Sequence, residues 1–235
     1  MSKLKEILNG EFSNQVRDFR PLCERFDFNI MTLGCSNAYG KGLEREQVFD
    51  FILKKEIEKH YNITVSNWNL ATPGNGSDHC KIIFNEEAPK LKPNLAIFWW
   101  PNFSRSFIFN KIENKFGGIK GKEDLVTKSY IKYISTDEQD IYNWYYNCYL
   151  FVKYLAKNLD IKLLHIAPDY PITDFLERND LTWYDLCDDI IFNNEIAIQI
   201  DSVSQTDSHR GLKTHEAFGK GLYKILKEKG YFEKL

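Results

Sequence analysis

The sequence lacks a long apolar run, a surplus of basic residues and any closely paired cysteines. Because no stretch of about 18 consecutive apolar residues occurs, we expect no membrane-spanning helix. Residues 1–8 also lack the continuous apolar core of a secretory signal peptide. The 31 basic and 33 acidic residues give a formal net charge of −2, so nucleic-acid binding has no electrostatic support. These absences predict a cytoplasmic protein without a membrane or nucleic-acid partner, and they leave the oligomeric state open.

The five cysteines are odd in number and widely spaced, and none forms a Cys-x-x-Cys pair. This spacing argues against a disulfide framework and against a zinc cluster. One other metal candidate combines Asp207, His209 and His215, but its His-x5-His spacing matches no standard helical metal pair. We therefore expect neither a metal nor a cofactor.

The chain does contain an alternation of apolar strands and amphipathic helices over its 235 residues. Expected strands cover residues 27–33, 63–70, 93–100 and 161–167, with a small one near 196–200, and expected helices cover 44–60, 78–91, 138–158 and 211–229. Residues 1–25 are predicted to form a helical N-terminal extension, and 103–136 an insertion or loop region. The alternation predicts an α/β protein, a three-layer α/β/α sandwich with a mostly parallel, doubly wound, flavodoxin-like sheet. No linker divides the chain, so we predict one domain, 1–235.

Polar loops follow three of the expected strands, and a fourth precedes the last helix. The strand-end loops carry Ser36, Gly74 and Asn102, and the fourth carries Asp207 and His209. In a doubly wound sheet these loops open on the same edge, where ligands bind. A hydroxyl, a histidine, a carboxylate and N–H donors are the groups that acyl transfer requires.

Four blocks of the sequence, in this order, resemble those of the SGNH hydrolases, also called GDSL-type esterases. The blocks are Leu33-Gly34-Cys35-Ser36, Asn69-Leu70-Ala71-Thr72-Pro73-Gly74, Phe98-Trp99-Trp100-Pro101-Asn102 and Asp207-Ser208-His209-Arg210-Gly211. The order and spacing cover roughly residues 27 to 229, and the resemblance is closest to divergent members in phages and their bacterial hosts. If the source is viral, the expected location is the host cytoplasm.

The resemblance implies that Ser36 is the nucleophile and that His209, with Asp207, is the base. It also implies an oxyanion hole made by the N–H groups of Ser36 and Gly74 and by the side chain of Asn102. The implied activity is that of a serine esterase acting on an ester, such as an O-acetyl group, of a carbohydrate or small molecule. The alternative is a binding or structural protein that keeps the fold without activity, because a fold does not fix a function.

Three departures from the family pattern leave alternatives open. Cys35 stands where the family has aspartate, the third block lacks the form Gly-x-Asn-Asp, and one residue instead of two separates Asp207 from His209. Asp201 is therefore a second candidate for orienting the base. Cys35 is expected to face the core, although a thiolate there would also be a nucleophile.

Several other polar residues are expected to have structural roles. His165 lies within an apolar strand and is predicted to be a buried, hydrogen-bonded core residue, whereas His79 is predicted on the surface. His215 falls inside the last helix and leans towards its N-terminus, which allows it to approach the cleft as a supporting group, while His209 is expected to be the base. Arg105 and Arg210 flank the expected cleft; one alternative is that they hold an anionic group of the substrate, and surface ion pairing is the favoured interpretation.

Overall fold

The computed structural model describes residues 26–102, 107–110, 115–118, 137–167 and 190–233. The predicted extension, 1–25, and most of the predicted insertion, 103–136, lie outside these ranges. Two described pieces of the insertion, strands β4 (Phe107–Asn110) and β5 (Lys115–Gly118), pair antiparallel as a hairpin. That the whole chain forms a single domain stays a prediction.

The described chain is built on a five-stranded sheet in the order β2-β1-β3-β6-β7. The strands are β1 (Phe28–Gly34), β2 (Val65–Asn69), β3 (Leu95–Trp99), β6 (Lys162–Ile166) and β7 (Ile190–Ile191). All four pairings in this sheet are parallel. Counted along the sheet, this is the flavodoxin-like order 2-1-3-4-5, which confirms the predicted fold class.

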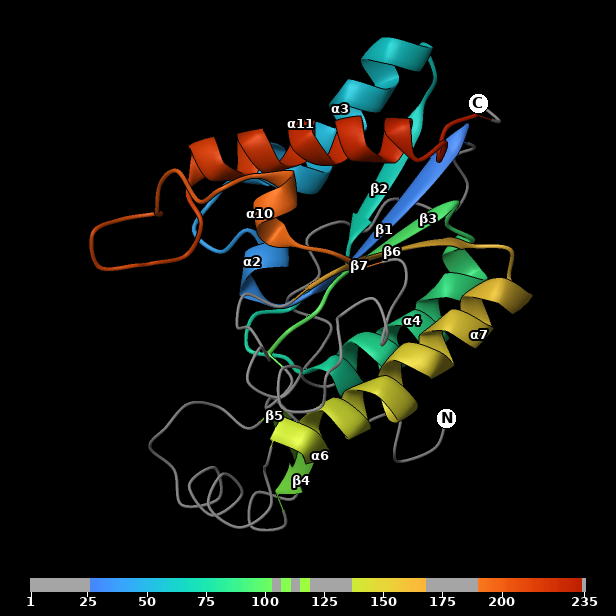
Figure 1. Cartoon of the computed structure of the whole chain (residues 1–235), viewed down its shortest axis with the longest axis vertical. Helices are drawn as coiled ribbons and strands as arrows, with labels where there is room; N and C mark the ends of the chain where they lie inside the picture. The colour runs from blue at the N-terminus through green and yellow to red at the C-terminus, as the bar shows by residue number, and fades with distance from the viewer. Residues whose placement is uncertain (1–25, 103–106, 111–114, 119–136, 168–189, 234–235) are drawn as a thin grey trace.

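Helices cover both faces of the sheet (Figure 1). Helices α3 (Phe49–Tyr61) and α11 (Leu212–Glu228) pack together on one face, above the sheet in the view of Figure 1. The other face carries α4 (Ser77–Leu91) and a longer helical run made of α6 (Asp137–Tyr142), a π-helical segment (Asn143–Tyr149) and α7 (Leu150–Asn158). The chain is therefore a three-layer sandwich.

Side-chain alternation along the strands divides the apolar core between these two faces. In β1, Ile30 belongs to the cluster under α3 and α11, whereas Met31 and Leu33 belong to the cluster under α4 and α7. Every residue of β3 is buried, as expected for the continuous apolar run of a central parallel strand. The sheet thus fixes where each strand ends, and with it the loops that follow.

Two predicted elements differ from the structure. The helix expected over 44–60 begins at Phe49, after a 3₁₀ turn at Arg45–Gln47, because Val48 is extended and the Glu44–Gln47 capping box closes the turn first. The strand expected near 196–200 was wrong. Asn193–Ile196 forms the short helix α10, while β7 lies earlier in the chain. Ile198 and Ile200 alternate as in a strand, but their side chains are 76% and 59% exposed.

Two histidines show how burial decides a residue's role. His165 is buried and its Nδ1 accepts a hydrogen bond from the indole N–H of Trp100 at 3.1 Å, which confirms the predicted core role. The surface position predicted for His79 was wrong, because its side chain is buried in α4 and burial lowers its pKa to about 4. In the described part of the chain, no helix is long and apolar enough to cross a membrane.

Candidate functional site

Ser36 opens a single helical turn, α2 (Ser36–Tyr39), directly after β1. Cys35 is extended, and the N–H of Tyr39 donates to its carbonyl oxygen at 2.9 Å. The turn is tight because Gly34 has a φ of +156°, and a Cβ there would lie 2.6 Å from both the Cβ of Ala38 and the carbonyl oxygen of Trp99. Glycine at this position lets the turn close against β3, so Ser36 lies at the carboxyl end of the sheet.

Asn69, at the end of β2, holds this turn from the neighbouring strand. Its side-chain N–H donates to the carbonyl oxygen of Ala38 at 2.9 Å, and its oxygen accepts from the N–H of Ala71 at 3.1 Å. Asn69 is fully buried. No role was predicted for Asn69 from the sequence. An asparagine within a buried strand nevertheless needs hydrogen-bond partners, and this requirement could have indicated its structural role.

The turn that carries Gly74 also lies beside the end of β1. The N–H of Thr72 donates to the carbonyl oxygen of Gly34 at 3.1 Å, and the N–H of Asn75 donates back to Thr72 at 3.3 Å. Gly74 has a φ of +82°, a left-handed conformation that favours glycine. The structure thus brings this turn to the sheet edge that carries Ser36.

His209 and Asp207 form a hydrogen-bonded pair in the loop before α11. Asp207 Oδ1 contacts His209 Nδ1 and accepts the backbone N–H of His209 at 3.0 Å. These hydrogen bonds from His209 lower the pKa of the Asp207 carboxyl below its ordinary value. The side chains are about one quarter and one third exposed. An ionised Asp207 therefore favours the tautomer with a proton on His209 Nδ1, which leaves Nε2 as an acceptor.

Asp201, the second candidate for orienting the base, faces the start of α11 instead. Its Oδ1 accepts from the backbone N–H and the hydroxyl of Thr214 at 2.8 and 2.7 Å, and its Oδ2 accepts from the N–H of Lys213 at 3.0 Å. Partial burial by itself raises the pKa of Asp201, but these hydrogen bonds outweigh it and lower the pKa. Asp201 therefore acts as a cap on the first turn of α11.

His215 is also engaged elsewhere. It is buried in α11, and its Nδ1 accepts the backbone N–H of Phe49, at the start of α3, at 3.2 Å. This bond satisfies one of the first amide groups of α3 and ties α3 to α11. His215 is not among the residues that line the cavity described below.

A cavity of about 590 Å³ opens between the ends of β1 and β3 and the loop before α11. Its lining brings together three predicted site residues, Ser36, Asn102 and His209; the other lining residues are Cys35, Asn37, Trp99, Trp100, Gln199, Ser208 and Arg210. Helix α3, which follows β1, and the helical run that follows β3 lie on opposite faces (Figure 1), and in the strand order β2-β1-β3-β6-β7 this makes the ends of β1 and β3 the switch point where ligands bind in open α/β sheets. Gly74 is not among the lining residues, so its part in an oxyanion hole stays a prediction.

Two further lining residues differ in burial. Cys35 is half-buried, and its thiol lies near that of buried Cys80, whose pKa is raised first by burial and then by Cys35. Arg210 is only 8% exposed, so it is not a surface residue, and its guanidinium lies 5.3 Å from the centre of the Trp99 ring and 5.9 Å from that of Phe218. Arg105 lies outside the described residues. Over the described ranges, no three His, Cys, Asp or Glu residues are grouped to hold a metal ion.

The amino-acid sequence matches no protein-family model and no curated protein. Its fold, however, is similar to solved structures over most of the chain. The psychrotrophic esterase EstA from Pseudoalteromonas sp., in a structure inhibited by monoethylphosphonate, has a TM-score of 0.53 at 12% identity, over 86% of this chain and 98% of that one. A protein assigned to the lipolytic G-D-S-L family, from Desulfitobacterium hafniense, has a TM-score of 0.51 at 11% identity, over 85% of this chain and 100% of that one.

A third similar structure is a two-domain esterase active on acetylated mannans, with a TM-score of 0.50 at 11% identity. The match covers 86% of this chain and 49% of that protein, so this chain spans about half its length. At such identities the likeness concerns the fold. The chain has the fold of the SGNH, or GDSL-type, hydrolases, as its four sequence blocks predicted.

Asn69→Ala tests whether Asn69 holds the Ser36 turn. The substitution leaves the carbonyl of Ala38 and the N–H of Ala71 without their partner, so we expect a loss of about 2–3 kcal/mol in the free energy of unfolding, measured with urea. The backbone amide hydrogen of Tyr39 in α2 should also exchange with solvent deuterium faster than in the native protein.

The matched control is Ser66→Ala, which removes the bond from Ser66 Oγ to Asn29 Oδ1 at the other end of the same strand pair. It should cost about 1 kcal/mol and leave the exchange of the Tyr39 amide unchanged. Equal exchange of that amide in both variants would contradict the role given to Asn69.

Proposed function

We propose that this protein is a serine esterase of SGNH type that works through an acyl-enzyme. The observation that carries the proposal is that Ser36, Asn102 and His209 line one cavity, with Asp207 hydrogen-bonded to His209. The cavity lies at the switch point of a fold shared with esterases. A hydroxyl, a base with its orienting carboxylate and amide donors at one cavity support acyl transfer better than any other reaction class.

In the proposed first step, Ser36 Oγ attacks the ester carbonyl and its proton passes to His209 Nε2. Asp207 holds the proton of Nδ1 and stabilises the imidazolium that forms. The tetrahedral intermediate then collapses, and His209 gives the proton to the departing alcohol. A water molecule, deprotonated by His209, hydrolyses the acyl-enzyme and releases the acid and Ser36.

The negative charge of the tetrahedral intermediate needs hydrogen-bond donors. Ser36 is the first residue of α2, and the first N–H groups of a helix have no acceptor within the helix. Asn102, three residues after β3, also lines the cavity, and its side-chain amide can donate hydrogen bonds. Together with the N–H of Gly74, these groups are the proposed oxyanion hole, which acts on charge that develops in the transition state.

The proposed substrate is an ester, such as an O-acetyl group, of a carbohydrate or small molecule. A volume of about 590 Å³ lies within the range typical of small-molecule sites. Polar residues such as Asn37, Asn102 and Ser208 line the cavity, as suits a ligand rich in hydroxyl groups. One protein with a similar fold acts on acetylated mannans, which supports this class without fixing it.

Ser36→Ala tests the nucleophile. We expect hydrolysis of 4-nitrophenyl acetate to fall by roughly 10³-fold or more, with an unchanged melting temperature, and labelling by a fluorophosphonate probe to disappear. Cys35→Ser, at the neighbouring position on the same cavity, is the control and should retain both hydrolysis and labelling.

The opposite result, loss of activity in Cys35→Ser with activity kept in Ser36→Ala, would move the chemistry to the thiol. Absence of labelling and hydrolysis in the folded native protein would favour the alternative, an inactive protein with the same fold.

Asp207→Asn and Asp201→Asn separate the two candidate carboxylates. Asp207→Asn should lower kcat/KM by about 10³–10⁴-fold, because the base loses its orienting partner, with little change in stability. Asp201→Asn should keep turnover within a few-fold but lower the free energy of unfolding by about 1–2 kcal/mol, the usual worth of a helix cap. Exchange of these two phenotypes would show that Asp201 orients the base.

The stability effect of Asp201→Asn should depend on pH. The pKa of Asp201 is lower in the folded than in the unfolded chain, so its contribution is complete above about pH 4, the ordinary pKa of aspartate. It is lost as the pH falls through the folded pKa. Urea unfolding of both proteins from pH 7 down to pH 3 should therefore show the difference shrinking in acid.

Asn102→Ala tests the oxyanion hole. Because the amide acts mainly in the transition state, we expect kcat to fall by about 10²–10³-fold with little change in KM. Gln199→Ala is the control, since Gln199 lines the same cavity but its amide nitrogen donates to its own loop, at Asp201, Ser202 and Ser208. An Asn102→Ala variant that loses substrate affinity at unchanged kcat would indicate a binding role instead.

A further inference from the structure

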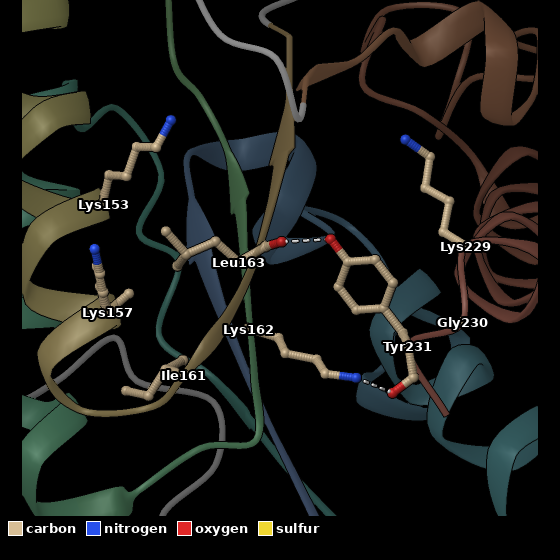
Figure 2. A pocket seen from close by; sticks show the side chains of 9 residues that line it. Lys153, Lys157, Ile161, Lys162, Leu163, Lys229, Gly230 and Tyr231 are labelled. Carbon is tan, nitrogen blue, oxygen red and sulfur yellow. Dashed lines mark hydrogen bonds between the residues drawn. The ribbon is translucent and has the colours of Figure 1, made fainter. Parts of the chain in front are cut away.

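A second cavity lies at the opposite edge of the sheet, where the strands begin. It has a volume of about 320 Å³ and is formed by the end of α7, the start of β6 and the residues that follow α11. Figure 2 shows Lys153 and Lys157 on α7 at one side, Lys229 and Tyr231 at the other, and Lys162 between them. Because β3 ends at the first cavity and β6 begins at this one, the two sites are separate.

Positive charge is concentrated at this cavity. Four lysines are among its nine lining residues, and no Asp or Glu is. The carboxylate of Glu233 lies beside the backbone of Gly230 at the rim, so an acidic side chain is also close to this surface. The protein as a whole has a net charge of −2, so the lysine-rich lining of this cavity differs from the charge balance of the whole chain.

Hydrogen bonds position the ammonium groups of two lysines. Lys162 Nζ donates to the backbone carbonyl of Tyr231 at 2.8 Å, and Lys153 Nζ donates to the hydroxyl of Tyr149 at 3.1 Å. In Figure 2 the Lys153 and Lys229 side chains extend from opposite sides towards the space above Leu163. Ammonium groups held in this way raise the local potential for an anion.

The cavity also offers a fixed apolar wall. Ala156, Ile161 and Leu163 line it, together with Tyr231. The Tyr231 hydroxyl donates to the carbonyl of Leu163 at 2.7 Å, which holds the ring in place (Figure 2). A ligand with an anionic group and a small carbon skeleton would therefore find a partner for each part, and the volume is at the low end of small-molecule sites.

Helix dipoles explain part of this arrangement. Lys157 lies in the last turn of α7 and Lys229 directly follows α11, and cations at helix C-termini are stabilising. That effect accounts for the sign of two charges. It does not account for Lys162, at the start of a strand, or for the presence of four lysines among the residues that line one concave, partly apolar surface. If the lysines only stabilise the helix ends, their replacement should lower the melting temperature. If they form a binding site, their replacement should weaken the binding of an anion.

We propose that this cavity binds a small phosphate monoester, such as a sugar phosphate. The lysines bind the phosphate as point charges, and the carbon skeleton packs on Tyr231 and the aliphatic wall. The proposal is independent of the esterase activity, and its test uses binding alone.

The experiment measures binding of glucose 6-phosphate to the full chain by titration calorimetry at low salt, with glucose and inorganic phosphate as reference ligands. We expect binding of glucose 6-phosphate at millimolar concentration or below, tighter than that of inorganic phosphate, no binding of glucose, and weakening as salt is added. No binding of glucose 6-phosphate at 10-fold higher concentration (about 10 mM) would overturn the proposal, and equal affinity for inorganic phosphate would overturn the assignment of an ester.

The double variant Lys157→Gln/Lys229→Gln should weaken binding by about tenfold or more, because it removes two charge-assisted contacts. The control, Lys59→Gln/Lys227→Gln, removes the same charge from exposed positions of α3 and α11 outside the cavity and should bind normally. Equal weakening in both variants would show that overall charge, not this cavity, attracts the ligand. Thermal melting of both variants checks that each is folded.

Discussion

The close contact between the end of β1 and the end of β3 is the constraint on which the candidate site depends. Gly34 pairs with Trp99 in the sheet, and a single methylene at Gly34 would meet the carbonyl oxygen of Trp99 at 2.6 Å. Both strands therefore leave the sheet at the same level. Ser36 follows two residues after Gly34, and Asn102 follows three residues after Trp99, so the two reach one cavity from adjacent strands.

Two aspartates of one loop have separate partners, although they lie six positions apart in the sequence. Asp201 caps the first turn of α11, and Asp207 pairs with His209. The loop between them is closed by its own hydrogen bonds, from the N–H of Val203 to His209 and from the N–H of Ser204 to Asp207. The loop that carries the proposed base is thus anchored to a long helix, which limits the conformations available to His209.

The parallel topology also explains why the two edges of the sheet differ in chemistry. In an α/β sandwich, helices run opposite to the strands that they connect, so helix C-termini gather where strands begin. The negative ends of α7 and α11 favour lysines there. The opposite edge carries the loops that follow the strands, with their serine, asparagine and histidine side chains. The serine, asparagine and histidine side chains and the lysines are therefore separated by the length of the strands.

The sequence by itself determined the fold class and the order of the central elements. Apolar runs such as that of β3 indicate buried strands wherever they occur, because burial on both faces demands apolar side chains throughout. The ordered blocks also named Ser36, Asn102 and His209 before their common cavity was known. The strand expected at Ile198 and Ile200 failed, because alternation specifies a half-buried strand only where a neighbouring strand is present to pair.

The tertiary structure decided the hydrogen-bond partners of the polar side chains at the site. The sequence named Asp207 as the partner of His209 and left Asp201 as a second candidate, and only the packing of the loop on α11 gives Asp201 to a helix end and Asp207 to His209. The surface position predicted for Arg210 was wrong for the same reason, since its surroundings come from segments far away in the chain, such as Trp99. The backbone partner of His215, Phe49, is equally distant in the chain. Sequence periodicity reports the face of an element, whereas the identity of a hydrogen-bond partner depends on how separate elements meet.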